Sequence, residues 1–296
     1  MSLVGTAKGK GIVAKVARPP VDLDLIFALI HHGCMSLPQE LVDHVIGVLY
    51  DDLLSLKACS LTCKSMFASA RRLIHRTLCL TLRNNMRILP QEEKKHPLAG
   101  YDGLCFISYV GEHGLLRYTR QVRIRDPYIF TPHTLLPHLA HFRSLNQVHT
   151  LAIDYFEAMA WARYHKTCFA HLYPTLTSLA LRSPSGDYRF LFKFALQFPR
   201  LENLCLESLR NEEWGTVDQV IVESSPPLHG HLRLARSVGP SVGRWLTELT
   251  SALPNKIKFR SVELECFLGQ HAQCIVNGCG ETLENLILVS DKFGER

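Results

Sequence analysis

Short pairs of apolar residues, separated by one residue, recur from residue 122 onward at nearly even intervals. The first members of the pairs are Val122, Leu151, Leu179, Leu204, Leu232, Val262 and Leu286. Successive pairs begin 24 to 30 residues apart. Apolar side chains at alternate positions are typical of a short β-strand with one buried face. A strand that returns at such an interval indicates a repeat protein, in which each unit buries its apolar face against its neighbours.

The segments between the apolar pairs contain helical patterns, for example over residues 134–145 and 188–201. One strand and one helix per unit is the format of leucine-rich repeats, whose parallel strands line the concave side of a solenoid. The Asn or Cys expected after each strand is mostly absent, so we expect an irregular, bent solenoid over residues 101–296. The alternative is an ordinary α/β domain whose strands happen to be evenly spaced.

In such a repeat, the residue between the paired apolar side chains points away from the core and is available to a partner. These outward positions are Arg123, Ala152, Ala180, Cys205, Arg233, Glu263 and Ile287. The charged members Arg123, Arg233 and Glu263 are our predicted target-binding residues. Their mixed charge predicts no single charge for the target.

A different pattern covers residues 36–82. Ser36 stands at an N-cap position with Pro38 in the first turn, which predicts the start of a helix. Apolar residues then recur every four positions: Leu37, Leu41, Val45 and Leu49. After Asp51 and Asp52 a second stripe comprises Leu56, Cys59, Cys63, Phe67, Ala70 and Ile74. We therefore expect a compact helical unit over 36–82, preceded by a disordered basic tail with a short helix (1–35) and followed by a linker (83–100).

The helical unit resembles the F-box. Leu37-Pro38, Glu40-Leu41, Ile46 and Leu49 match its opening helix, and "DDLLSLKACSLTCKSMF" matches its second and third helices. The variant is similar to F-box proteins of mushroom-type fungi, in which degenerate leucine-rich repeats follow. The resemblance implies a substrate-recognition subunit of a Skp-cullin-F-box (SCF-type) ubiquitin ligase. The F-box docks on the Skp adaptor, which a cullin-RING complex holds, and the rest of the chain captures an unknown protein substrate.

The same resemblance implies a set of adaptor contacts. A helical unit of this size cannot complete its own core, so an apolar face covered by a partner is expected. The contacts are Leu37, Pro38, Leu41, Ile46, Leu49, Leu56, Cys59, Leu61, Cys63, Lys64 and Met66. The family usually has an aromatic residue where this chain has Met66. The alternative function is a leucine-rich-repeat scaffold that binds a partner without ubiquitin transfer.

The ten cysteines raise the question of a metal site. Cys59 and Cys63 lack two further ligands nearby, which zinc would need. A second group, Cys266, His271, Cys274 and Cys279, leaves a zinc-dependent binding module as an alternative, although its spacing matches no common zinc motif. We favour cysteines that pack as small apolar residues, and we expect no metal and no cofactor.

Composition narrows the remaining classes of function. The net charge of +6 over 296 residues includes no run of more than two basic residues, which does not favour a nucleic-acid partner. No apolar stretch reaches the roughly 18 residues of a membrane span, and no secretory signal is evident. No phosphate-binding loop, G-x-S-x-G or H-E-x-x-H motif occurs. We expect a non-enzymatic protein of the cytoplasm, the nucleus or both.

Overall fold

The fold is known from a computed structural model. It describes residues 38–50, 52–62, 64–80, 103–125, 139–155, 168–183, 191, 194–208, 227–235, 257–265, 273 and 276–289. The predicted tail, the predicted linker and Ser36 lie outside these residues. Of the helix predicted over 188–201, residues 191, 194 and 195 are helical, residues 196–201 are not, and the other five lie outside the described residues. Among the described residues, no helix is both long enough and apolar enough to cross a bilayer.

Three helices form a unit at the N-terminal end of the described chain: α2 (Gln39–Val48), α3 (Leu53–Thr62) and α4 (Lys64–Ile74). Helix α4 packs against both α2 and α3. The predicted start at Ser36 was two residues too early, because Pro38 occupies the N-cap position and its carbonyl accepts the N–H of Leu41 and Val42. Proline suits a helix start because its missing N–H would have no partner inside the helix.

The predicted stripe from Leu56 to Ile74 is divided between α3 and α4. Because the helix direction changes near residue 63, Phe67 lies on the exposed side of α4 instead of following Leu56 into the core. At the start of α3, the Asp52 carboxylate accepts the N–H of Leu54 and of Ser55, both at 3.1 Å. The Ser55 hydroxyl also donates to this carboxylate, and its hydrogen bond, followed by those of the backbone N–H groups, lowers the pKa of Asp52. The backbone bonds fix where α3 begins.

The described strands form one parallel eight-stranded sheet, in which each strand pairs with the next in sequence. The strands are β1 (Thr77–Leu80), β2 (Gln121–Ile124), β3 (Thr150–Asp154), β4 (Ser178–Arg182), β5 (Asn203–Glu207), β6 (Leu228–Ala235), β7 (Ile257–Glu265) and β8 (Asn285–Val289). All seven predicted apolar pairs lie in strands, which confirms that part of the prediction. Strand β1 was missed: it fell within the predicted helical unit, yet Leu78 and Leu80 lie in the core of the sheet.

The backbone bonds at the start of the strands repeat from one strand to the next. The carbonyl oxygen of Arg120 accepts the N–H of His149 and Thr150, and that of His149 accepts the N–H of Thr177 and Ser178. The Thr177 carbonyl accepts the N–H of Glu202 and Asn203 in the same way. The entry to β3, β4 and β5 therefore has one geometry, although the intervening sequences differ.

The ends of the same three strands also repeat. Tyr155, Ser183 and Ser208 follow β3, β4 and β5 with φ angles of 57°, 44° and 56°. The N–H of each donates to the last carbonyl of the following strand, at 2.8 to 2.9 Å. Since few side chains favour positive φ, the sheet contacts hold these residues there.

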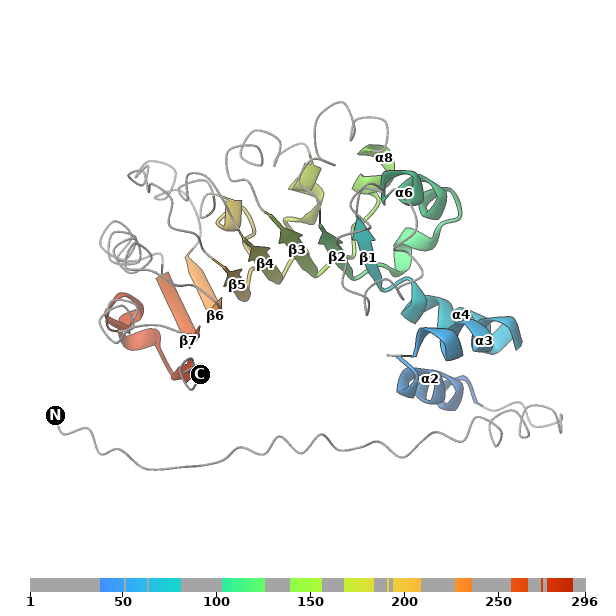
Figure 1. Cartoon of the computed structure of the whole chain (residues 1–296), viewed down its shortest axis with the longest axis horizontal. Helices are drawn as coiled ribbons and strands as arrows, with labels where there is room; N and C mark the ends of the chain where they lie inside the picture. The colour runs from blue at the N-terminus through green and yellow to red at the C-terminus, as the bar shows by residue number, and fades with distance from the viewer. Residues whose placement is uncertain are drawn as a thin grey trace, which may run out of the picture.

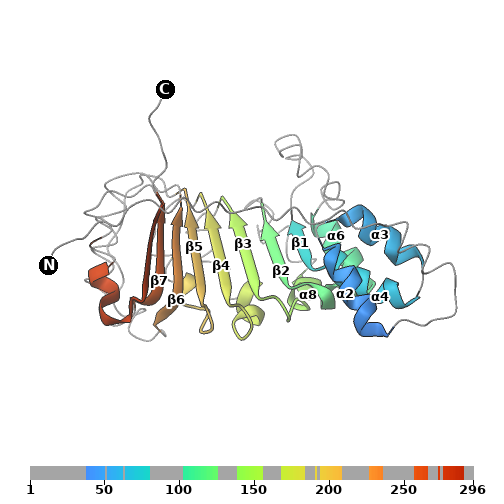
Figure 2. The same cartoon turned by 90° about the horizontal axis from the view of Figure 1, so that it is seen from below.

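The two α-helices described between β1 and β3 lie on one side of the sheet. Figure 1 shows the strands side by side along an arc, with α6 (Gly103–Glu112) and α8 (Leu139–Arg143) on the convex side. Helix α8 falls within the helix predicted for 134–145. The opposite face, seen in Figure 2, has no described helix in front of β2 to β7. The architecture is a mixed α/β fold with a parallel sheet and helices.

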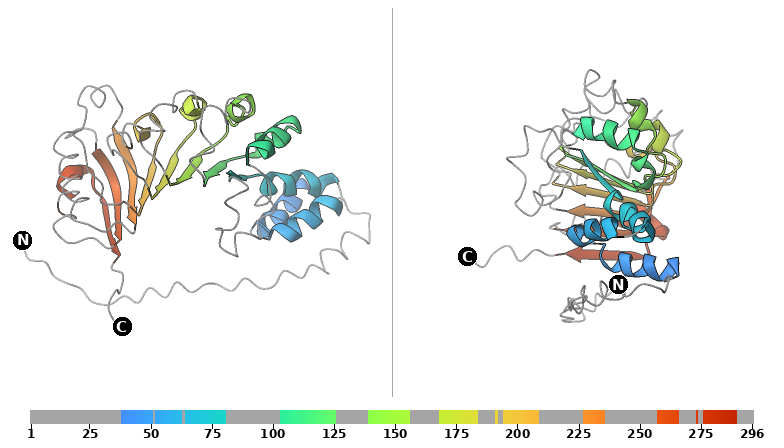
Figure 3. Two further views of the ribbon diagram at one scale, coloured as in Figure 1. Left: turned by 45° about the horizontal axis from the view of Figure 1, so that its top comes forward. Right: turned by 90° about the vertical axis from the view of Figure 1, so that its right-hand side faces the viewer.

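Aromatic side chains connect successive segments on the helix-covered side. Phe142, Phe169, Phe194 and Phe198 meet edge to face, with ring centroids 5.3 to 5.8 Å apart. Phe142 precedes β3, Phe169 precedes β4, and Phe194 and Phe198 precede β5. All four are buried. This aromatic row joins the units along the sheet, in the direction of the arc in Figure 3.

Gly230 allows the close approach of two backbones within the sheet. It has a φ of 86°, lies at a register shift between β6 and β7, and a Cβ there would be 2.1 Å from the Glu202 carbonyl oxygen. We expect Gly230→Ala to lower the free energy of unfolding by about 1–3 kcal/mol through backbone strain. Gly47→Ala in α2, where a Cβ meets nothing within 4 Å, should be neutral or stabilising. Urea unfolding of both variants tests this, and equal effects would contradict it.

Candidate functional site

The seven outward positions predicted from the sequence lie in one row across the open face of the sheet. Strand pairing aligns Arg123 with Ala152, Ala180, Cys205, Arg233, Glu263 and Ile287 in turn. We call these residues the outward row. The structure thus places the predicted target-binding residues in this one row, with Arg233 and Glu263 on neighbouring strands and Arg123 four strands away from Arg233. Their use by a partner stays a prediction.

The middle of the outward row has small side chains. Ala152, Ala180 and Cys205 are neighbours on β3, β4 and β5, and charged residues stand toward both ends. Burial raises the pKa of the Cys205 thiol to about 11, and the Glu207 carboxylate adds to this effect. The thiol is therefore neutral near pH 7 and is a poor nucleophile. These three small side chains, which we call the small-residue strip, offer a partner a shallow contact area.

A line of ion pairs runs beside this strip, two residues further along the strands. Asp154 lies 2.9 Å from Arg123 and 3.6 Å from Arg182, whereas Arg182 lies 2.9 Å from Glu207. The sequence analysis missed Asp154, Arg182 and Glu207. The alternation that identified the outward row, continued by two positions, would have found them. A second set joins Arg233 to Glu263 at 3.2 Å.

Asp154 is the buried carboxylate on which this line depends. We expect Asp154→Asn to lower the free energy of unfolding by about 1.5–3 kcal/mol, because it removes the charge that the arginines face while keeping the side-chain shape. Glu263→Gln is the matched control, since its partner Arg233 is 44% exposed and such pairs contribute under about 1 kcal/mol. Urea denaturation at pH 7 compares the two. Equal losses would show that Asp154 is no more than a surface partner.

The second candidate surface is on the helical unit. Leu61 is 86% exposed, Leu54 78% and Leu41 51%, so three leucines present their side chains to solvent. Leu54 and Leu61 are seven residues apart on α3, which places them on the same face of that helix. Leu54 was not among the predicted contacts. Apolar residues occupy six of the ten positions of α3 and are not confined to one face, so the sequence did not show which of them are exposed.

The predicted adaptor contacts differ in their exposure to solvent. Pro38, Leu41, Leu61 and Lys64 are exposed, whereas Leu37 and Cys63 lie outside the described residues. The other predicted contacts are buried in the core of the helical unit: Ile46, Leu49, Leu56, Cys59 and Met66. They face the neighbouring helices, and as the unit stands they offer no surface to a partner. These residues form the core of the unit that carries the exposed leucines, and their contact with an adaptor stays a prediction.

Met66 is one of these core residues. Its side chain is buried, and its sulfur accepts a hydrogen bond from the Thr62 hydroxyl at 3.3 Å. The flexible thioether of Met66 therefore serves packing inside the unit. Cys59 is buried in the same core as Met66.

The proposed zinc ligands are only partly described. Cys279 is buried in the core of the sheet, and burial raises the pKa of its thiol, which disfavours the thiolate that zinc binds. Cys266, His271 and Cys274 lie outside the described residues. Within the described ranges, no three His, Cys, Asp or Glu side chains gather as a metal site would require.

Two surfaces thus stand out: the exposed leucines of α2 and α3, and the outward row with its flanking ion pairs. They lie on different elements of the described chain. No family model, curated protein or solved structure matches this chain.

Proposed function

We propose that this chain is a substrate-recognition subunit of an SCF-type ubiquitin ligase. Helices α2 to α4 act as an F-box that docks on a Skp adaptor, and the sheet acts as a degenerate leucine-rich-repeat region that captures a protein target. The observation that carries the proposal is a helical unit with a packed core of its own that still exposes Leu41, Leu54 and Leu61. Large apolar side chains exposed on one helix face, as Leu54 and Leu61 are on α3, are typical of a surface that a partner covers.

The repeated sheet supports the second half of the proposal. Seven strands with the same apolar pair, joined in sequence order and with recurring bonds at both ends of β3 to β5, match the one-strand-per-unit format of leucine-rich repeats. Repeat proteins of this kind bind partners on the face formed by their strands. The outward row and the ion-pair line occupy that face.

In this proposal the chain positions its target protein and does not catalyse the reaction. It would hold a target lysine near a ubiquitin-conjugating enzyme that the cullin-RING complex carries, and no bond would be made or broken on its own residues. Proximity of this kind converts a bimolecular encounter into a far more favourable intramolecular one. Exposed polar residues of the outward row would select the target, and the leucines of α2 and α3 would fix the subunit in the complex.

Calorimetric titration of the full chain with a purified Skp adaptor tests the proposal. We expect a saturable one-to-one complex, and addition of the cullin-RING complex should then give one larger assembly on gel filtration. No complex with the adaptor would reject the ubiquitin-ligase function and leave the alternative of a repeat scaffold that binds a partner without ubiquitin transfer.

A further inference from the structure

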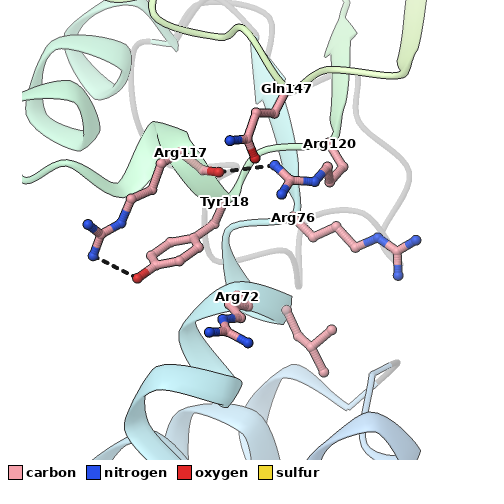
Figure 4. Close-up of a pocket in the computed structure, with 7 residues that line it drawn as sticks. Arg72, Arg76, Arg117, Tyr118, Arg120 and Gln147 are labelled. Atoms are coloured by element: carbon pink, nitrogen blue, oxygen red, sulfur yellow. Dashed lines mark hydrogen bonds between the residues drawn. The ribbon is translucent and has the colours of Figure 1, made fainter. Parts of the chain in front are cut away.

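Four arginines line a single cavity where the helical unit meets the sheet. Arg72 and Arg76 come from the end of α4 and the turn after it, and Arg117 and Arg120 come from the short helix η2 (Leu115–Tyr118) and the turn before β2. The cavity has a volume of about 460 Å³. Figure 4 shows the two segments facing each other across it, with Tyr118 between them.

The hydrogen bonds around this cavity leave many guanidinium N–H groups unused. Arg117 donates to the Tyr118 hydroxyl at 2.8 Å, and Arg120 donates to the carbonyl oxygen of Arg117 at 3.0 Å. Both acceptors are neutral. Among the described residues, Arg72 and Arg76 have no hydrogen bond or ion pair from their side chains, and no carboxylate lines the cavity.

This arrangement differs from that of the arginines on the strands. Arg123, Arg182 and Arg233 each lie within 3.2 Å of a carboxylate oxygen. Three arginines of the open face are thus paired, yet four gather at the cavity without a counter-charge among the described residues that line it. Grouped like charges repel one another, so the cavity attracts an anion.

Helix termini explain only part of the cluster. Basic residues in the last turn of a helix interact favourably with its dipole, and Arg71 and Arg72 occupy the last turn of α4. Arg71 is also held over the Phe67 ring at 4.3 Å, away from the cavity lining. The dipole gives no reason for Arg117 and Arg120 to face the same space from a separate segment.

We propose that this cavity binds a phosphate dianion, either as a phosphorylated side chain on a partner protein or as free inorganic phosphate. Guanidinium groups match phosphate oxygens with paired N–H donors, and the Tyr118 hydroxyl and the Gln147 amide add neutral donors at the rim. A bound phosphate would bridge α4 and η2, and so tie the helical unit to the sheet. The site goes beyond the proposed function and uses none of the exposed leucines.

Calorimetry on the full chain tests the site with three probes: inorganic phosphate, a short phosphoserine peptide, and the same peptide unphosphorylated. We expect the phosphorylated probes to bind, and Arg72→Gln combined with Arg117→Gln to weaken binding about tenfold or more. Arg200→Gln is the matched control, an exposed arginine outside the cavity lining, and should change affinity less than about twofold. Thermal unfolding of each variant without ligand verifies that the fold is retained.

Each outcome of these titrations either identifies the phosphate source or overturns the proposal. Tighter binding of the phosphopeptide than of phosphate identifies a modified partner, and equal binding identifies free phosphate. No binding of either, equal binding of the unphosphorylated peptide, or an unaffected double variant overturns the proposal. A single-stranded RNA oligomer that binds more tightly than the phosphopeptide, and loses binding in the same variant, overturns it in favour of a phosphodiester ligand. Adaptor binding, measured on the same double variant, should be unchanged, so failure of this site is distinguishable from failure of the proposed function.

Discussion

Phe169→Ala is expected to lower the free energy of unfolding by about 3–5 kcal/mol, the usual cost of removing a fully buried aromatic side chain. Phe169 is completely buried and stands in the middle of the aromatic row, where its ring meets Phe142 at 5.8 Å and Phe194 at 5.6 Å. These three side chains come from three successive inter-strand segments. The substitution therefore opens a cavity and also removes two edge-to-face contacts that join neighbouring units.

The matched control is Phe67→Ala on α4. Phe67 is 41% exposed, and the Arg71 guanidinium lies over its ring, 4.3 Å from the centroid. Phe67→Ala should therefore lower the free energy of unfolding by less than about 1 kcal/mol. Urea unfolding at 25 °C, followed by circular dichroism, measures both variants. A loss at Phe169 no larger than that at Phe67 would mean that the aromatic row does not hold the units together.

The strands could be predicted from the sequence because alternation in a buried strand is a local property. Every pair from Val122 to Leu286 became a strand, and the paired register followed from placing leucine over leucine. Strand β1 escaped because "TLCL" lies far from the next pair and directly after a helical pattern. Its membership of the sheet depends on pairing with β2, which no local pattern encodes.

The residues that face a partner were harder to predict in the helical unit. A period of 3.6 residues identifies an apolar face but does not tell whether another helix of the same chain already covers it. Ile46 and Leu56 were therefore grouped with Leu41 and Leu61, although the first two are buried and the last two are exposed. In the strands this ambiguity did not arise, because the two faces alternate residue by residue.

The arginine cavity could not be predicted at all. Arg72 and Arg117 are distant in the sequence. Arg72 lies at the end of a helix, whereas Arg117 lies just before a strand. Neither segment carries a phosphate-binding motif. The cluster arises only because η2 packs beside α4 in the folded chain.

Leu61→Lys is expected to abolish most of the affinity for the Skp adaptor under the proposed function, with a loss of about thirtyfold or more. Residues at the centre of an interface commonly contribute 2 kcal/mol or more, and a lysine there would in addition bury a charge. Because Leu61 is 86% exposed in the free chain, the same substitution should change the free energy of unfolding by less than about 0.5 kcal/mol. Titration calorimetry with purified adaptor gives the first value and urea unfolding the second.

Leu288→Lys is the matched control, because Leu288 is 63% exposed on β8, a strand of the sheet and not of the helical unit. It introduces the same charge on an exposed leucine and should leave adaptor affinity unchanged. Equal binding by Leu61→Lys and the unmodified chain would remove α3 from the interface, whereas loss of binding in both variants would point to a non-specific effect of charge. Loss confined to Leu61→Lys would locate docking on the exposed leucines, because the buried residues of the helical unit remain intact in both variants.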